Sequence, residues 1–182
     1  MSARSIDFLD KFSIAVLLLL ASDPLASHYQ REIARKAGVS VGKTNQILKA
    51  LEAEEVVLKA HVGKVDLYRY NLQSPLARQL KILFSLYEIG GLIKNLRKAS
   101  NRIILYGSCA EGSDTKESDI DLLVVSDEKQ GTQRAIRREA RSIVRTVSPI
   151  VLTPLEFSGL KQKDLAFYEQ VSRGMTLWEK EG

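Results

Sequence analysis

The chain has few of the residues from which several kinds of functional site are built. Its 182 residues include one cysteine, Cys109, and only two histidines. A single cysteine excludes an intrachain disulfide framework and a cysteine-based zinc site, and it fits the reducing cytosol. His28 and His61 have no partner at a zinc-ligand spacing. We therefore expect a cytoplasmic protein in which Cys109 is a small, buried side chain.

Long hydrophobic runs are also missing. The most apolar run extends from Ile14 to Ala21 and has eight residues, whereas a membrane-spanning helix needs about 20. Asp7 and Asp10 precede this run, where a secretory signal would carry positive charge. The run therefore predicts a buried core helix and no membrane partner.

Charge is spread unevenly along the chain. Residues 1–99 contain 15 Lys/Arg and 9 Asp/Glu, a net charge of +6, whereas residues 100–182 contain 12 and 13, a net charge of −1. This asymmetry indicates two modules with different partners. Nucleic acid is the natural partner of the basic module.

Residues 1–72 carry the pattern of a small DNA-binding domain. Apolar spacing predicts helices over residues 6–21, 28–37 and 41–54, with Gly38 ending the second and Ser40 capping the third. Two strands flanking Gly63 then predict a hairpin. This order resembles the winged helix-turn-helix of many microbial regulators. The resemblance implies that the second helix of the motif enters the major groove of double-stranded DNA.

The residues that contact DNA follow from this arrangement. Ile47, Leu48 and Leu51 form one apolar stripe, so the other side of their helix faces outward. Amide and lysine side chains there suit base edges, and basic residues of the hairpin suit phosphates. The predicted contact residues are Gly42, Lys43, Asn45, Gln46, Lys49, Lys59, His61 and Lys64. We expect a homodimer, since such regulators commonly bind two half-sites; the alternative is a solvated basic face used for protein contact.

Gly42-Lys43-Thr44 is superficially similar to a phosphate-binding P-loop. That motif needs four residues between its glycines and follows a strand. Only three residues separate Gly38 from Gly42, and a predicted helix precedes them. We therefore exclude a P-loop.

Residues 73–99 predict a connecting helix. Pro75 suits its first turn, and apolar residues recur every three or four positions from Leu76 to Tyr87. Gly90-Gly91 interrupts the pattern, which predicts a bend. The apolar stripe packs either on its own chain or on a second subunit.

The pattern changes to alternating strands and helices over residues 100–182. Strands are predicted at 103–106, 120–125, 150–152 and 175–178, and helices at 130–147 and 163–174. The whole chain is therefore expected to be α+β, with a C-terminal domain whose helices lie on one face of a mixed sheet. Arginines recur along the first helix and form a solvated face or a surface for nucleic acid or an acidic partner. They are Arg134, Arg137, Arg138, Arg141 and Arg145.

A compact constellation in this half carries chemistry. Gly107 lets the backbone approach a ligand closely, and Ser108 offers a hydroxyl at the start of a helix. Asp119 and Asp121 are two residues apart on a strand, so both point to one face. Two ionised carboxylates on one face repel, and Mg²⁺ relieves that repulsion while bringing phosphate oxygens with it.

This Gly-Ser and Asp-x-Asp spacing resembles the minimal nucleotidyltransferases of the DNA polymerase beta superfamily, over residues 100–182. The resemblance implies that Gly107 and Ser108 bind the triphosphate of an NTP, and that Asp119 and Asp121 hold Mg²⁺ and are catalytic. The family's third carboxylate lies on the strand that here includes residues 147–153. No Asp or Glu occurs between Glu139 and Glu156. Glu111 stands where relatives commonly carry a basic residue.

Three functions follow from these observations. The first is a DNA-binding regulator whose nucleotidyltransferase-type domain binds Mg–NTP. The second is an active nucleotidyltransferase that transfers NMP to a protein or small molecule. The third is a protein-interaction scaffold, such as one half of a two-gene toxin–antitoxin-like pair.

Overall fold

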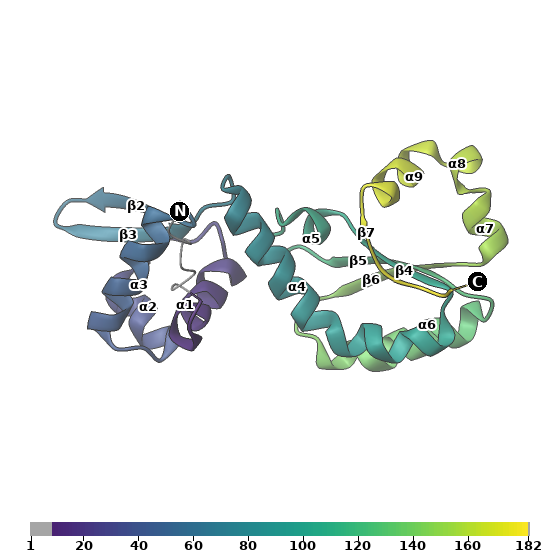
Figure 1. Cartoon of the computed structure of the whole chain (residues 1–182), viewed down its shortest axis with the longest axis horizontal. Coiled ribbons are helices and arrows are strands. Elements are labelled where there is room, and N and C mark those ends of the chain that lie inside the picture. The colour runs from purple at the N-terminus through teal and green to yellow at the C-terminus, as the bar shows by residue number, and fades with distance from the viewer. Residues whose placement is uncertain (1–8, 182) are drawn as a thin grey trace, which may run out of the picture. The chain divides into compact units, whose positions relative to one another are not determined.

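The chain folds into two compact units, Met1–Leu80 and Lys81–Gly182. Residues 9–181 are described by the structure, a computed structural model (Figure 1). The boundary between the units falls inside helix α4 (Pro75–Leu96), which contributes to both. Within the described residues, no helix combines the length and the apolar character needed to cross a membrane.

Three helices build the first unit. They are α1 (Lys11–Ser22), α2 (Gln30–Ala37) and α3 (Val41–Ala53). Gly38 ends α2 with a φ of 67°, and the Ser40 side chain accepts a hydrogen bond from the backbone N–H of Lys43. Both predicted caps are therefore confirmed. The first helix begins at Lys11, because Asp10 caps it. Residues 9 and 10, which were expected to be helical, therefore lie before the helix. Residues 6–8 of the predicted helix lie outside the described residues.

A three-stranded antiparallel sheet completes this unit. The predicted hairpin is confirmed as β2 (Val57–Val62) and β3 (Val65–Tyr70). The expected start of a helix at His28 is wrong. His28–Tyr29 forms the short strand β1, which pairs with Tyr68 and Leu67 of β3. Backbone hydrogen bonding to a distant strand therefore outweighs the local helical pattern.

The apolar run of α1 supplies much of the core of this unit. Leu17 and Leu20 are fully buried, as are Leu48 and Leu51 of α3. Leu18, however, is 45% exposed on the other side of α1. The run therefore forms a core helix as predicted, but only one side of it is buried, and the side with Ile14 and Leu18 is partly exposed.

The second unit is built on a four-stranded mixed sheet in the order β6-β5-β4-β7. Strand β4 pairs antiparallel with β5 and β7, and β5 pairs parallel with β6. This confirms the predicted mixed sheet. The strands are β4 (Arg102–Tyr106), β5 (Ile120–Val125), β6 (Val147–Leu152) and β7 (Met175–Glu179).

Helices cover both faces of this sheet, so the expectation of one covered face is wrong. The last turns of α4 and the helix α6 (Lys129–Glu139) pack on one face, through residues such as Leu96 and Ile136. Helices α8 (Leu160–Lys163) and α9 (Leu165–Ser172) pack on the other, through Leu160 and Val171. Figure 1 shows these two layers, with α7 (Pro154–Ser158) next to α8.

Several helix boundaries differ from the sequence prediction. Helix α4 continues through Gly90 and Gly91 as one helix. Helix α6 ends at Glu139 and is followed by the 3-10 turn Ala140–Ser142. Arg145 therefore lies outside the helix on which it was expected. The last predicted helix, residues 163–174, is α9, which begins at Leu165 because the Asp164 side chain caps its N-terminus.

Candidate nucleotide site and DNA-binding surface

Gly107 stands at the end of β4 and begins the short helix α5 (Ser108–Glu111). Its φ of 69° and ψ of −157° belong to a region that is essentially restricted to glycine. A Cβ at this position would lie 2.6 Å from Oδ2 of Asp121. Glycine is therefore required twice, for its backbone conformation and for the close approach of the carboxylate.

Asp121 occupies the centre of the site. It belongs to β5, where it pairs with Tyr106 on one side and with Ser148 on the other. Side chains alternate between the two faces of a strand, so Asp121 lies on the same face of β5 as Leu123. Leu123 packs on the sheet face that α8 and α9 cover. Partial burial raises the pKa of the Asp121 carboxyl, and the nearby carboxylate of Asp119 raises that pKa further. The predicted acid pair is therefore brought together, although Asp119 lies just before β5 and not on the strand as expected.

The strand that carries the third carboxylate in related enzymes carries a serine here. Ser148 is the β6 residue that pairs with Asp121, and its Oγ donates a hydrogen bond of 2.8 Å to Oδ2 of Asp119. A neutral donor therefore stands beside the acid pair.

The acids closest in sequence on either side of Ser148 are engaged elsewhere. Glu139 accepts hydrogen bonds from Asn95 and Arg138. Glu156 caps the start of α7 and binds Lys129. Across residues 9–181 no group of three or more His, Cys, Asp or Glu side chains could hold a metal ion. Asp119 and Asp121 fit one hard cation that arrives with phosphate oxygens, and they lack the third acid of a two-ion centre.

Ser108 and Cys109 follow Gly107 in α5. Ser108 is half-buried at the first position of the helix, next to the glycine that approaches Asp121. Cys109 is fully buried, as predicted. Burial raises the pKa of its thiol to about 11, which disfavours the reactive thiolate, and the thiol donates a hydrogen bond to the carbonyl of Asp119.

A buried ionic network behind this loop was not predicted from the sequence. Asp114 is 3% exposed, and its Oδ2 accepts from Arg145 at 2.8 Å and from Lys81 at 3.1 Å. Arg145 also binds Glu88 and Ser85 of α4. The partners of Arg145 are 31 to 60 residues away from it in the chain, so no local sequence pattern predicts these contacts. The network ties the loop after α5 to helix α4.

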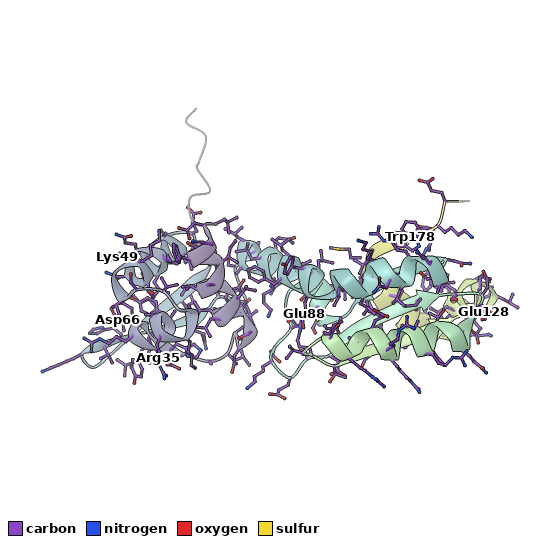
Figure 2. All side chains as sticks on the ribbon, turned by 90° about the horizontal axis from the view of Figure 1, so that it is seen from below. Arg35, Lys49, Asp66, Glu88, Glu128 and Trp178 are labelled. Carbon is purple, nitrogen blue, oxygen red and sulfur yellow. The ribbon has the colours of Figure 1, made fainter. Side chains whose placement is uncertain are left out.

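Helix α3 presents one side to solvent in the first unit. Ile47, Leu48 and Leu51 are buried, which confirms the predicted inward stripe. Figure 2 labels Lys49 on this helix. The predicted contact residues of α3 are exposed or half-buried, namely Gly42, Lys43, Asn45, Gln46 and Lys49.

Three of the predicted DNA-contacting side chains have partners within the chain. Lys43 Nζ lies 3.0 Å from Oδ2 of Asp10, the residue that caps α1. Asp66 on β3 binds both Lys59 and His61, and it is labelled in Figure 2. Lys64, in the turn of the hairpin, is exposed. Contact with phosphate at Lys43, Lys59 or His61 therefore competes with an internal carboxylate.

Sheet order, the glycine turn and the acid pair together define a nucleotidyltransferase-type domain joined to a winged helix-turn-helix domain. The family model "Polymerase beta, Nucleotidyltransferase" matches residues 91–181, and the model "Winged helix-turn-helix DNA-binding" matches residues 9–57. The chain belongs to the polymerase beta nucleotidyltransferase family.

Comparisons with individual proteins add less. No curated protein matches the chain. A crystal structure of a candidate nucleotidyltransferase from Sulfolobus solfataricus is 22% identical, with a TM-score of 0.36, and covers 58% of this chain and 86% of its own. The archaeal chromatin protein TrmBL2 is 14% identical, with a TM-score of 0.31, and covers 90% and 72%. At these TM-scores neither likeness supports a conclusion about function.

Proposed function

We propose that this protein is a DNA-binding regulator whose nucleotidyltransferase-type domain binds Mg–NTP but does not transfer a nucleotide. Gly107 and Ser108 contact the triphosphate, and Asp119 and Asp121 hold the Mg²⁺ that accompanies it. The winged helix-turn-helix unit binds double-stranded DNA through α3 and the hairpin. The bound nucleotide is then a signal that the protein senses.

The observation that carries this proposal is the hydrogen bond from Ser148 to Asp119. In the family, the third carboxylate completes the site of the ion that activates the attacking hydroxyl. A serine hydroxyl is a weak ligand without negative charge, so the nucleotide-borne ion keeps two carboxylates while the second ion loses its site. Binding is thereby retained and chemistry is lost.

Nucleotide binding and transfer are tested together. The full chain is titrated with each NTP in Mg²⁺ by calorimetry, and it is incubated with each labelled NTP in Mg²⁺ or Mn²⁺, alone and with cell extract. We expect binding that Asp119→Ala with Asp121→Ala abolishes, and no label on the chain or on another molecule. Absence of binding would contradict the nucleotide part of the proposal.

DNA binding is tested on the same protein with a promoter library. We expect an affinity that falls steeply with salt, by about one log unit of affinity per log unit of salt for each phosphate contacted. Gln46→Ala with Lys49→Ala should weaken binding to the selected sequence, because both side chains are exposed on α3. Salt-independent or absent binding would overturn this part.

An active nucleotidyltransferase is the second candidate. The close approach of Gly107 to Asp121 and the nearness of the Asp119 carboxylate favour it, because these features serve catalysis as well as binding. Labelling of an acceptor in the extract, lost in the double alanine variant, would establish transfer in place of sensing. A homodimer suits both candidates, and sedimentation of the full chain tests it.

A further inference from the structure

Helix α6 carries a row of arginines that neither the nucleotide site nor the winged helix uses. Arg134, Arg137, Arg138 and Arg141 are all exposed. The last three lie three, four and seven residues after Arg134, so all four share one side of α6 and of the 3-10 turn that extends it. Figure 2 shows nitrogen-tipped side chains that extend outward from this helix.

The side of α6 opposite the arginines is packed against the rest of the second unit. Ile136 and Thr132 are buried against the sheet and the end of α4. Thr132 Oγ1 donates to the carbonyl of Ala99, and Asn95 Nδ2 donates to Glu139, so both ends of α6 are bonded to the α4 segment. The arginines therefore project from a helix with a defined position.

The neighbouring surface of α4 and of the 3-10 turn Arg97–Ala99 that follows it is basic as well. Lys94 and Lys98 are exposed on the same segment that contacts α6 through Asn95. Arg97 is not included in this surface, because its guanidinium stacks over the Trp178 ring, 5.2 Å from the ring centroid. The basic face is defined as Lys94, Lys98, Arg134, Arg137, Arg138 and Arg141.

Few carboxylates neutralise this basic face. Within residues 9–181, only one of the six cations of the basic face forms an ion pair. Arg138 pairs with Glu139 at 2.9 Å. That pair is largely exposed, and an exposed pair of this kind contributes about 0–1 kcal/mol. The guanidinium groups of Arg134, Arg137 and Arg141 are therefore available to an external anion.

The basic face is distinct from the nucleotide site. Helix α6 packs on the sheet face formed by Ile120 and Leu122, whereas Asp121 has the opposite orientation in β5. The sheet thus separates the basic face from the acid pair. A phosphate bound by the arginines is not the triphosphate of an NTP held by Asp119 and Asp121.

The composition of this face favours a polyanion over an acidic protein. A stable protein interface is centred on buried apolar or aromatic anchors. In the described helix α6 no large hydrophobic side chain is exposed, and its other exposed residues include Gln130 and Gln133. Val144, which follows the 3-10 turn, is 97% exposed, but a single valine does not form an apolar centre. Four arginines spread over about 10 Å of helix match the phosphate spacing of one strand of a duplex, which carries one charge per about 3.4 Å of the axis.

We propose that the basic face is a second DNA-binding surface, which binds the phosphate backbone of double-stranded DNA without selecting a sequence. It adds affinity to the recognition that the winged helix-turn-helix unit provides. It also assigns a DNA-binding role to the nucleotidyltransferase-type domain itself.

The test compares full-length variants in binding to the selected duplex and to random-sequence DNA at several salt concentrations. Replacing Arg134, Arg137, Arg138 and Arg141 together with Gln should lower the salt slope by roughly 3–4, at about 0.9 per phosphate contact. Affinity for both duplexes should fall by the same factor, so the preference for the selected sequence is retained. Replacing the same four residues with Lys should keep most of the affinity.

A matched control removes four charges elsewhere in the unit. Lys161, Lys163, Arg173 and Lys180 are exposed outside the basic face, and their replacement with Gln changes net charge equally. An equal loss in this control, or an unchanged salt slope in the arginine variant, would overturn the second surface. Binding of an acidic protein but not DNA by the arginines would overturn it too. The sequence-specific binding lost in the α3 variant is a separate readout, so either proposal can fail alone.

Discussion

Ser148 Oγ donates a hydrogen bond of 2.8 Å to Oδ2 of Asp119, from the β6 residue that pairs with Asp121. The acid pair therefore has a neutral neighbour that stabilises its charge. A carboxylate in the same place would add a third negative charge, which only a bound cation would balance. The residue at position 148 therefore determines how many cations the acid pair can bind.

Ser148→Asp should convert the acid pair into a three-carboxylate site. We expect the affinity for Mn²⁺ to rise at least about tenfold, which corresponds to about 1.4 kcal/mol, because a charged ligand replaces a neutral one. Electron paramagnetic resonance of free Mn²⁺ measures this affinity. Ser148→Asn introduces a side chain with the shape of aspartate but no charge, so it should leave the affinity for Mn²⁺ unchanged. An equal gain in affinity in both variants would refute the explanation.

Gly107→Ala should destabilise the second unit. The backbone conformation alone costs a residue with a Cβ roughly 1–3 kcal/mol, and the new Cβ would also displace the Asp121 carboxylate. Urea unfolding of the full chain measures the loss. Gly91→Ala is the control, because nothing lies within 4 Å of a Cβ there in helix α4, and it should stabilise by about 0.5–1 kcal/mol. Equal effects of the two variants would contradict this account.

Asp114→Asn should also be strongly destabilising. It removes the carboxylate that Lys81 and Arg145 share, while both cations stay near its site. Breaking a buried pair in this way costs about 3–5 kcal/mol. Glu169→Gln provides the comparison, since the Glu169–Arg173 pair is exposed and an exposed pair contributes about 0–1 kcal/mol. Similar unfolding midpoints for the two variants would rule out a structural role for the network.

The stability of the first unit should depend on Glu32 at acidic pH. Lys36 and His28 hold the pKa of Glu32 down at about 2 instead of 4.5. A depressed pKa stabilises the fold above about pH 4.5, and this contribution is lost as the pH falls toward 2. Thermal unfolding of the wild type and Glu32→Gln should therefore differ at pH 6, and the difference should shrink below about pH 4.5 and vanish only near pH 2. A difference that does not change with pH would argue against the ion pairs.

Local patterns predicted most elements because they depend on near neighbours. Ser40 and Gly38 were recognisable as caps, since capping needs only the adjacent turn. The strands on either side of Gly63 were recognisable from their alternation. The pairing of His28 with Tyr68 was not, because a two-residue strand exists only when a distant partner is present.

The site shows the same division. Gly107 and the two aspartates were found by spacing, because a turn and a strand place residues by fixed local geometry. The position of Ser148 needed the parallel pairing of β5 with β6, in which its partner is 27 residues away in the chain. Arg145 was assigned to a helical face, whereas the structure directs it to Asp114 and Glu88.

The sequence by itself determined the two modules, the mixed sheet and the acid pair, since composition and short-range periodicity encode them. Only the tertiary structure decided which side chain completes the acid pair, which charges are buried and which arginines remain exposed. The physical reason is that these properties belong to pairs of distant residues. Their burial and hydrogen bonding arise when strands and helices pack, and no segment of the chain contains them alone.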